Sequence, residues 1–238
     1  MGQLFLSVVV PAYNEESRIA LTLEQLSTYL GRQEYSWEII VADDGSMDAT
    51  ANIVSDWASS NGLIRLVRLD HRGKGWAVQQ GMLAARGEYR FLCDADLSMP
   101  VEQIDRFVAQ AGDSPDIVLG SRELPDSRRI GEPARRHLMG RVFNLIIRVL
   151  AVPGIRDTQC GFKLFKAETT APLFETQVLE GFAFDVEILC LARVLGLDIR
   201  EIAIDWHYRE GSKVRPVRDS FRMVRDVLRV RSRLKTRT

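Results

Sequence analysis

Apolar residues in the first half of the chain form short, nearly continuous runs separated by longer amphipathic stretches. Such runs, rich in β-branched residues and bounded by turn residues, are typical of strands buried on both faces. We interpret as strands residues 4–10, 37–42, 64–69, 89–93 and 116–120. Helices are expected at residues 17–30, in a segment ending near Trp57, and at residues 76–85 and 103–110. The alternation predicts an α/β fold with a mostly parallel sheet flanked by helices.

The second half of the chain has a less regular pattern. A charged loop is expected at residues 128–136, and a loop leading into a strand at residues 157–165. The remaining elements expected are a helix at residues 137–150, a helix at 182–194, a strand at 199–206 and a basic helix at 216–235. No apolar run reaches the roughly 18–20 residues that a membrane-spanning helix needs.

Polar and glycine residues cluster where four of the five predicted strands end. The clusters are Tyr13-Asn-Glu-Glu16, Asp43-Asp-Gly45, Asp94-Ala-Asp96 and Gly120-Ser-Arg122. The carboxyl ends of parallel strands share one edge of a sheet, and open α/β sheets bind their ligands there. A single acidic loop can reflect the turn preference of Asp alone. Four such loops along one edge indicate a binding site.

Asp94 and Asp96 follow a predicted strand at a spacing that lets both side chains point the same way. Two adjacent carboxylates repel unless a cation lies between them, and hard divalent ions prefer oxygen ligands. We therefore expect this pair to hold Mg²⁺ or Mn²⁺, with open positions for substrate phosphates. The carboxylates of Glu15, Asp43 and Asp44 can accept hydrogen bonds from ribose and base. The edge therefore suits a nucleoside diphosphate.

Other phosphate-binding patterns are absent from the sequence. There is no Gly-x-x-x-x-Gly-Lys-Ser/Thr loop, which excludes a P-loop NTPase. No Gly-x-Gly-x-x-Gly follows the first strand, which disfavours a dinucleotide-binding fold. Lys74, between two glycines, is either a flexible phosphate contact or a solvated turn lysine.

The net charge of the 238 residues is zero, but the charge is unevenly distributed. Residues 1–120 carry 9 Lys+Arg and 17 Asp+Glu, whereas residues 121–238 carry 23 and 15. The acidic half suits a metal site, and the basic half suits anions. Three cysteines without framework spacing indicate reduced thiols and a cytosolic location.

Five motifs occur in the order and spacing of a known family. They are Val10-Pro-Ala-Tyr-Asn-Glu-Glu16, Asp43-Asp-Gly-Ser46, Gly73-Lys-Gly75, Asp94-Ala-Asp-Leu-Ser98 and Gly120-Ser-Arg122. Together they resemble the family 2 glycosyltransferases, which have the Rossmann-like GT-A fold. A sixth segment is Asp157-Thr-Gln-Cys-Gly-Phe-Lys163. It is similar to a segment of the polyprenyl-phosphate sugar transferases, and its residues look closest to those of the dolichyl-phosphate β-glucosyltransferases.

The resemblance implies roles for individual residues. It implies that the donor nucleotide-sugar is bound by Pro11, Tyr13, Glu15, Asp43, Asp44, Lys74, Asp94 and Ala95. Asp94 and Asp96 would be the Asp-x-Asp motif that contacts donor and metal. The acceptor phosphate would be held by Arg122, Arg135, Arg136, Arg209, Ser212 and Lys213. The residues expected to take part in catalysis itself are Asp94, Asp96, Arg122, Arg209 and Lys213.

By this resemblance the chain is expected to move a hexose onto a polyprenyl phosphate of the dolichyl or undecaprenyl type. UDP-glucose is the first choice of donor and GDP-mannose the second, because Ser98 stands where mannosyl relatives have a metal-binding Gln. A phosphate monoester is already largely dianionic at neutral pH. No protein base is therefore needed, and none of the three histidines is expected in a sheet-edge loop. Direct attack on the sugar's C1 implies inversion.

Other interpretations stay open at this point. A nucleotidyltransferase also uses paired Asp and metal, and a sugar-nucleotide sensor would bind without catalysis. Asp185 and Glu187 lie two apart on a predicted helix, so only one can face the site. His207 is interpreted as a strand-end residue and Trp76 as core.

We predict two parts, a catalytic domain at residues 1–212 and a basic amphipathic helix at residues 213–238. An apolar stripe is expected on one face of that helix, formed by Val217, Phe221, Val224 and Leu228. Such a helix can lie on an anionic membrane surface, which predicts a peripheral protein on the cytosolic face of a membrane. The alternative is a helix docked on the domain. Nucleic-acid binding does not fit a sugar-transfer site and is not expected.

Overall fold

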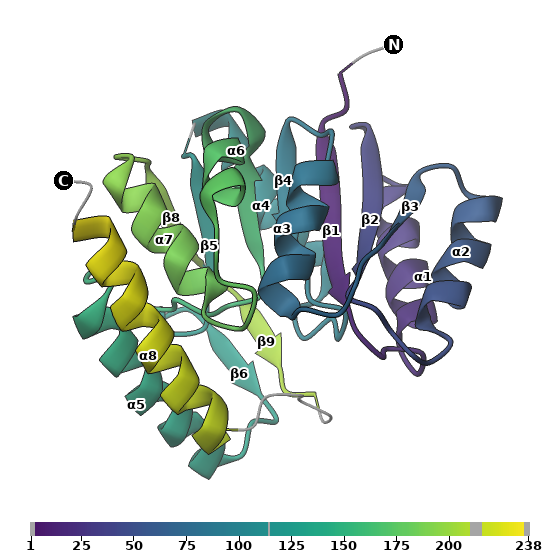
Figure 1. The fold of residues 1–238 in the computed structure, drawn as a ribbon. Helices are drawn as coiled ribbons and strands as arrows, with labels where there is room; N and C mark the ends of the chain where they lie inside the picture. The colour runs from purple at the N-terminus through teal and green to yellow at the C-terminus, as the bar shows by residue number, and fades with distance from the viewer. Residues whose placement is uncertain (1–2, 114, 210–215, 236–238) are drawn as a thin grey trace.

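In the computed structural model, which describes residues 3–113, 115–209 and 216–235, one seven-stranded sheet lies between two layers of helices (Figure 1). The strand order is β3-β2-β1-β4-β7-β5-β8. Their bounds are β1 Leu6–Ala12, β2 Trp37–Asp43, β3 Ile64–Arg68, β4 Tyr89–Leu92, β5 Ile117–Ser121, β7 Lys163–Lys166 and β8 Ile199–Ala203. The five strands predicted in the first half are all present.

Helices cover both faces of the sheet. Their bounds are α1 Ile19–Leu30, α2 Thr50–Ser60, α3 Lys74–Ala84, α4 Ile104–Val108, α5 Ala134–Leu150, α6 Ala167–Thr176, α7 Phe184–Val194 and α8 Pro216–Lys235. Two short 3₁₀ turns, η1 Val101–Gln103 and η2 Ala111–Asp113, flank α4, so the helix expected at residues 103–110 is shorter and more irregular than predicted.

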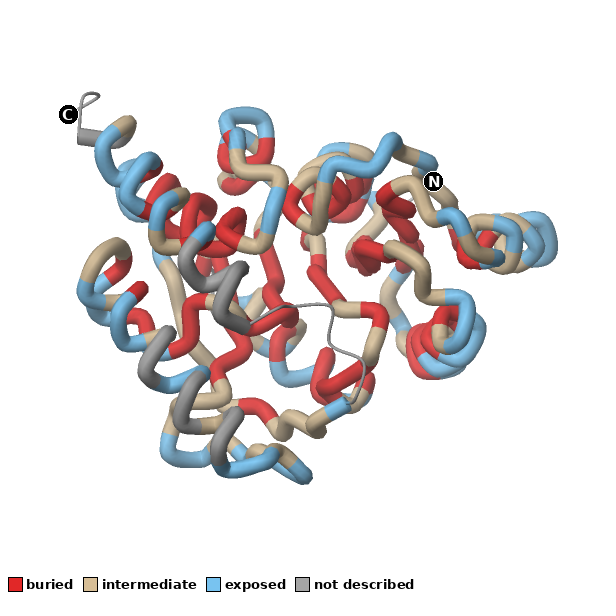
Figure 2. The backbone as a smooth tube through the Cα atoms, turned by 60° about the horizontal axis from the view of Figure 1, so that its bottom comes forward, coloured by how far each residue is buried: buried red, intermediate tan, exposed pale blue. Residues whose placement is uncertain are grey.

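Side-chain alternation along β1 divides the core into two. Val8 and Val10 pack on one face with residues of α1, α2 and α4, whereas Val9 packs on the other face with residues of α3, α6 and α7. All seven residues of β1 are buried, as are all seven of β2. Continuous apolar runs are therefore explained by a sheet that is covered on both sides. Figure 2 shows these buried strands from the carboxyl edge of the sheet.

The register places the predicted polar clusters at one edge. β1 pairs in parallel with β2 and β4. β7 is antiparallel to both β4 and β5, so β4 and β5 run in the same direction. The carboxyl ends of β1, β2, β4 and β5 therefore point to one side, as the sequence predicted.

Element boundaries in the second half of the chain also differ from the prediction. The strand expected at residues 199–206 is divided into β8 and β9 Asp205–His207, because the chain crosses at buried Ile204 to pair with β6 Arg128–Ile130 in a second sheet. β6 occupies part of the segment expected to be a charged loop. Helix α5 begins at Ala134 rather than residue 137, since Pro133 at its N-cap accepts the first helical hydrogen bond, from His137.

Candidate active site

A cavity of about 690 Å³ opens at the carboxyl edge of the sheet. Its walls come from distant parts of the chain, including the end of β1, the loop before α3, the turn after β4 and the helix α8. The predicted donor and metal residues that line it are Pro11, Tyr13, Glu15, Asp44, Lys74, Asp94, Ala95 and Asp96. The structure thus brings these residues together, while their binding roles stay predictions.

Asp94 and Asp96 lie in a tight turn just beyond β4, not on the strand itself. The strand ends at Leu92, and the Leu97 amide donates to the Asp94 carbonyl at 3.2 Å. Leu97 has a φ of 46°, a left-handed conformation that costs a non-glycine residue roughly 1–2 kcal/mol. The Ser98 amide donates to Asp96 Oδ1 at 2.9 Å, which orients that carboxylate. Both carboxylates therefore reach the cavity through turn geometry, where strand alternation had been predicted.

Lys74 provides a cation beside this pair. Its Nζ lies 2.7 Å from Asp94 Oδ1. Burial would lower the pKa of Lys74, but the carboxylates of Asp94 and Asp185 outweigh burial and raise that pKa. The lysine is therefore charged at neutral pH and faces the site, which decides against the solvated turn lysine considered from the sequence.

The two glycines beside Lys74 have a steric role. A Cβ on Gly73 would lie 2.6 Å from the Glu180 carbonyl oxygen, and one on Gly75 would lie 2.5 Å from the Leu179 carbonyl oxygen. Gly73 also has a φ of 132°. The Gly73-Lys-Gly75 motif therefore lets the start of α3 pack against the chain before α7 and presents Lys74 to Asp94.

Asp44 stabilises the loop between β3 and α3. Its carboxylate accepts hydrogen bonds from the amides of Arg72, at 3.0 Å, and Gly73, at 2.9 Å, and lies 2.8 Å from Nδ1 of His71. Asp43 is buried and accepts hydrogen bonds from the Ser46 hydroxyl and amide. The cavity lining in the described part of the chain does not include Asp43. Both carboxylates thus shape the loops around the cavity.

His71 corrects an expectation from the sequence. It lies in the loop after β3, and its ring stacks on Tyr13 with centroids 4.1 Å apart and planes 17° apart. No histidine was expected in a sheet-edge loop, because the end of the third strand lacks a polar cluster as dense as the other four. Trp76, expected in the core, is only partly buried and lies under the Arg72 guanidinium, 4.1 Å from its ring centroid.

Asp185 and Glu187 point in different directions, as their spacing predicted. Asp185 is buried and accepts a hydrogen bond from the Lys163 ammonium, and its charge also acts on Lys74. The Glu187 carboxylate instead accepts hydrogen bonds from the amides of Val178 and Leu179. Burial raises the pKa of Asp185 despite the neighbouring lysines.

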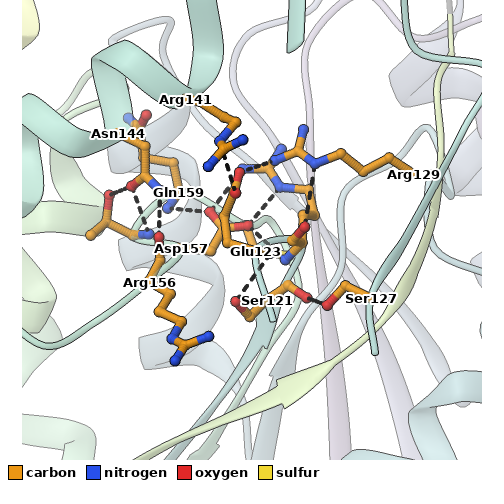
Figure 3. A network of polar contacts seen from close by, with 12 residues as sticks. Ser121, Glu123, Ser127, Arg129, Arg141, Asn144, Arg156, Asp157 and Gln159 are labelled. Carbon is orange, nitrogen blue, oxygen red and sulfur yellow. Dashed lines mark hydrogen bonds and ion pairs between the residues drawn. The ribbon is translucent and has the colours of Figure 1, made fainter. Parts of the chain in front are cut away.

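Arg122 is committed to an ion pair, and its guanidinium lies 5.6 Å from the ring centroid of Trp206, which lines the cavity. Its Nε and Nη2 donate to Asp157 at 2.7 and 2.9 Å, and its amide donates to the same carboxylate at 3.0 Å. Burial alone would raise the pKa of Asp157, but Arg122 lowers it to about 2. Figure 3 shows Asp157 within a polar network that also contains Glu123, Arg129 and Arg141. Arg122 is not among the described residues that line the cavity, so the structure does not bring this predicted phosphate contact to the site.

The basic side of the cavity contains both predicted and unpredicted residues. Arg209 lines it as expected. Arg222 of α8 also lines it, together with Met223 and Asp226, and was not predicted as a site residue. Its sequence signal was the arginine repeat of the basic helix, which does not say which arginine turns inward. Arg135 and Arg136 lie in the first turn of α5 with side chains outside the described set, and Ser212 and Lys213 lie outside the described residues.

The fold and the site together define a class of protein. The structure matches the crystal structure of glucosyl-3-phosphoglycerate synthase from Mycobacterium tuberculosis in complex with Mn²⁺, UDP-glucose and glycerol 3-phosphate, with a TM-score of 0.66 and 22% identity. The match covers 96% of this chain and 79% of the other. The fold is the GT-A fold of glycosyltransferases.

Sequence comparison then gives the family. Residues 7–172 match the model of the family described as Glycosyl transferase family 2. The dolichyl-phosphate β-glucosyltransferase of Dictyostelium discoideum is 40% identical over 98% of this chain and 76% of its own length. The human protein of the same name is 36% identical over 97% of this chain and 76% of its own. The chain belongs to glycosyltransferase family 2, which confirms the resemblance stated from its motifs.

Proposed function

We propose that this enzyme transfers glucose from UDP-glucose to a polyprenyl phosphate of the dolichyl type. The observation that carries the proposal is the cavity itself, which combines the Asp94 and Asp96 carboxylates with Lys74, Arg209 and Arg222. Relatives that match nearly the whole chain are named dolichyl-phosphate β-glucosyltransferases, and that name supports both sugar and acceptor.

A divalent ion, Mg²⁺ or Mn²⁺, fits this site. The Lys74 ammonium lies 2.7 Å from Asp94 Oδ1, and this attraction of a positive charge supports a cation site at the carboxylate. Across the residues the structure describes, no group of three or more His, Cys, Asp or Glu side chains could enclose a metal. An ion held by Asp94 and Asp96 would take its other ligands from the diphosphate and water, the usual arrangement for Mg²⁺. When bound, it would neutralise charge on the UDP leaving group.

The side chains of the protein hold two anions in line. Lys74 stays charged beside Asp94 and can contact the donor diphosphate. Arg209 and Arg222 bring positive charge to the same cavity for the acceptor phosphate. A phosphate oxygen then bonds to C1 of glucose as the bond from C1 to the UDP oxygen breaks. The α-linked donor therefore gives a β-linked product, without a protein base, since the monoester arrives ionised.

GDP-mannose is the alternative donor. Ser98, which stands where mannosyl relatives have a metal-binding Gln, is buried, and its amide donates to Asp96 Oδ1. Its short side chain supports UDP-glucose over GDP-mannose. The decisive experiment incubates the protein with radiolabelled UDP-glucose or GDP-mannose, Mn²⁺ and dolichyl phosphate. Label should enter the organic phase from UDP-glucose alone. Label from GDP-mannose alone would overturn the sugar assignment, and label from neither would overturn the proposed transfer.

The C-terminal helix is docked on the domain, and its buried face matches the predicted stripe only in part, since Val224 packs against the core. Met223, Val227 and Val230 are buried against the body of the protein, whereas Leu228 is 48% exposed. α8 lies beside α5 and α7 (Figure 1). Val217 and Phe221 have side chains outside the described set. The fully buried positions of α8 thus lie one residue before the predicted ones, for example Val227 in place of Leu228.

We infer that the membrane-facing surface is formed by α5 and α8 together. Leu145, Ile146 and Val149 of α5 are 55, 42 and 71% exposed, and Leu228 of α8 is also exposed. Exposed arginines on α8, Arg225 and Arg229, add positive charge that suits anionic lipid. No helix among the described residues is long and apolar enough to cross a bilayer. We propose that residues 1–212 carry the chemistry and that residues 213–238 help to hold the protein at the cytosolic face of a membrane.

Vesicle co-sedimentation tests this surface. Truncation of α8 would expose the buried Val227 and Val230, so point variants are preferable. Val149→Glu with Leu228→Glu should abolish sedimentation with vesicles that contain phosphatidylserine. Leu63→Glu, at a position 45% exposed near β3, is the matched control and should sediment like the unchanged protein. Equal binding by all three proteins would place the contact elsewhere.

A further inference from the structure

Gly161 packs directly against the carboxylate of Asp94. A Cβ built on Gly161 would lie 1.9 Å from Asp94 Oδ2, 2.3 Å from Cγ and 2.8 Å from Oδ1. These are the three nearest heavy atoms outside its own neighbours, and all belong to one side chain. Real Cβ atoms do not approach other atoms so closely, so any other residue at position 161 has to displace Asp94.

The backbone conformation of Gly161 does not by itself require glycine. The described residues with positive φ do not include it, whereas Gly73, Gly131 and Gly154 have φ values of 132°, 78° and 94°. The requirement is therefore steric. The close approach follows from the sheet register. Antiparallel β7 pairs Lys163 with Leu92, the last residue of β4. The turn before β7, which contains Gly161, therefore lies against the turn after β4, which contains Asp94.

Lys163 fixes the turn that contains Gly161. Its side chain is 1% exposed, and its ammonium donates both to the Cys160 carbonyl and to Asp185. Asp94 is held separately by its ion pair with Lys74, at 2.7 Å. The turn at Gly161 therefore limits the space around the Asp94 carboxylate, while the Lys74 ammonium pairs with it.

We infer that Gly161 is a positioning residue for Asp94. Its missing side chain leaves the space that the carboxylate occupies while it contacts Lys74 and faces the cavity. The steric part of this inference stands on the geometry alone. Its consequence for metal and donor binding rests on the proposed function.

A double-mutant cycle on thermal stability tests the steric part. Gly161→Ala should lower Tm by roughly 5 °C, as expected for overpacking in a chain of this size. Asp94→Ala removes all three clashing atoms, so adding Gly161→Ala to it should change Tm by less than about 1 °C on the same scale. An equal loss in both backgrounds would show that position 161 needs glycine for a reason other than Asp94. Because the double variant is expected to fold, the cycle gives an answer even if Gly161→Ala alone does not.

Binding of Mn²⁺ in the presence of UDP, followed by the EPR signal of free Mn²⁺, tests the consequence. Gly161→Ala should weaken binding by about tenfold or more, within the range for supporting residues of metal sites. Gly62→Ala is the matched control, since a Cβ there meets nothing within 4 Å, and it should bind as the unchanged protein does. Unchanged affinity in Gly161→Ala, with the stability cycle as expected, would overturn the positioning role. Absence of Mn²⁺–UDP binding in the unchanged protein would instead contradict the proposed function and leave the stability cycle valid.

Discussion

Replacement of Asp157 by Asn should destabilise the protein, because it breaks the buried pair with Arg122. The pKa of Asp157 falls from the ordinary 3.8 to about 2 in the folded protein. A tenfold change in proton affinity is worth about 1.4 kcal/mol, so the ionised carboxylate contributes about 2 kcal/mol at neutral pH. Leaving the Arg122 guanidinium without its partner adds to the loss, and the total should be about 3 kcal/mol. Tm should fall by roughly 6–12 °C.

The pH dependence gives this prediction a second signature. A carboxyl group with a depressed folded-state pKa stabilises the protein fully above its unfolded pKa, here 3.8, and loses that contribution as pH falls through about 2. The difference between wild type and Asp157→Asn should therefore be constant from neutral pH down to about pH 5 and shrink below 3.8.

Urea unfolding followed by tryptophan fluorescence provides the measurement, at pH 7 and at lower pH. Asp126→Asn, at an exposed position, is the control and should change stability by less than about 0.5 kcal/mol. A similarly small change for Asp157→Asn would refute the reasoning. It would also mean that Arg122 is not committed to Asp157 and is available to bind phosphate.

Three further predictions concern the reaction. Asp96→Asn should reduce glucosyl transfer by about a hundredfold or more while leaving Tm unchanged, and EDTA should abolish wild-type transfer; full activity in EDTA would contradict a metal role. Arg209→Ala should raise KM for dolichyl phosphate roughly tenfold or more, with UDP affinity unchanged; loss of UDP affinity instead would move Arg209 to the donor site. The acid limb of the pH–rate profile should follow the acceptor's own second ionisation, near pH ~6, in wild type and in His71→Gln alike. A limb that moves in the His71 variant would identify a protein base.

The fold was largely predictable because a sheet covered on both faces needs continuous apolar runs, and these are visible in single segments such as β1 and β2. The position of the cavity at the carboxyl edge of the sheet was also predictable, because parallel strands end at the same edge. Contacts between distant segments were not predictable. The Asp157 that neutralises Arg122 lies 35 residues further along the chain, and no local pattern connects the two.

Similar limits explain the other differences. An apolar stripe on a helix can be assigned to either of two adjacent faces, and on α8 packing selected Met223 and Val227 over Leu228. His71 was missed because the turn that brings it onto Tyr13 depends on Asp44, which lies at the end of a different strand.

The position of β7 in the sheet has a consequence for the order of folding. Among the described strands, β5 pairs with β7 and β8 alone, and both come later in the sequence. The four strands β3, β2, β1 and β4 can therefore assemble first, with β4 as an unpaired edge until residues 163–166 arrive. Loop closure over such separations slows folding, and an open edge strand favours aggregation meanwhile. Refolding should therefore pass through a half-formed sheet, and chaperones that cover strand edges should raise its yield.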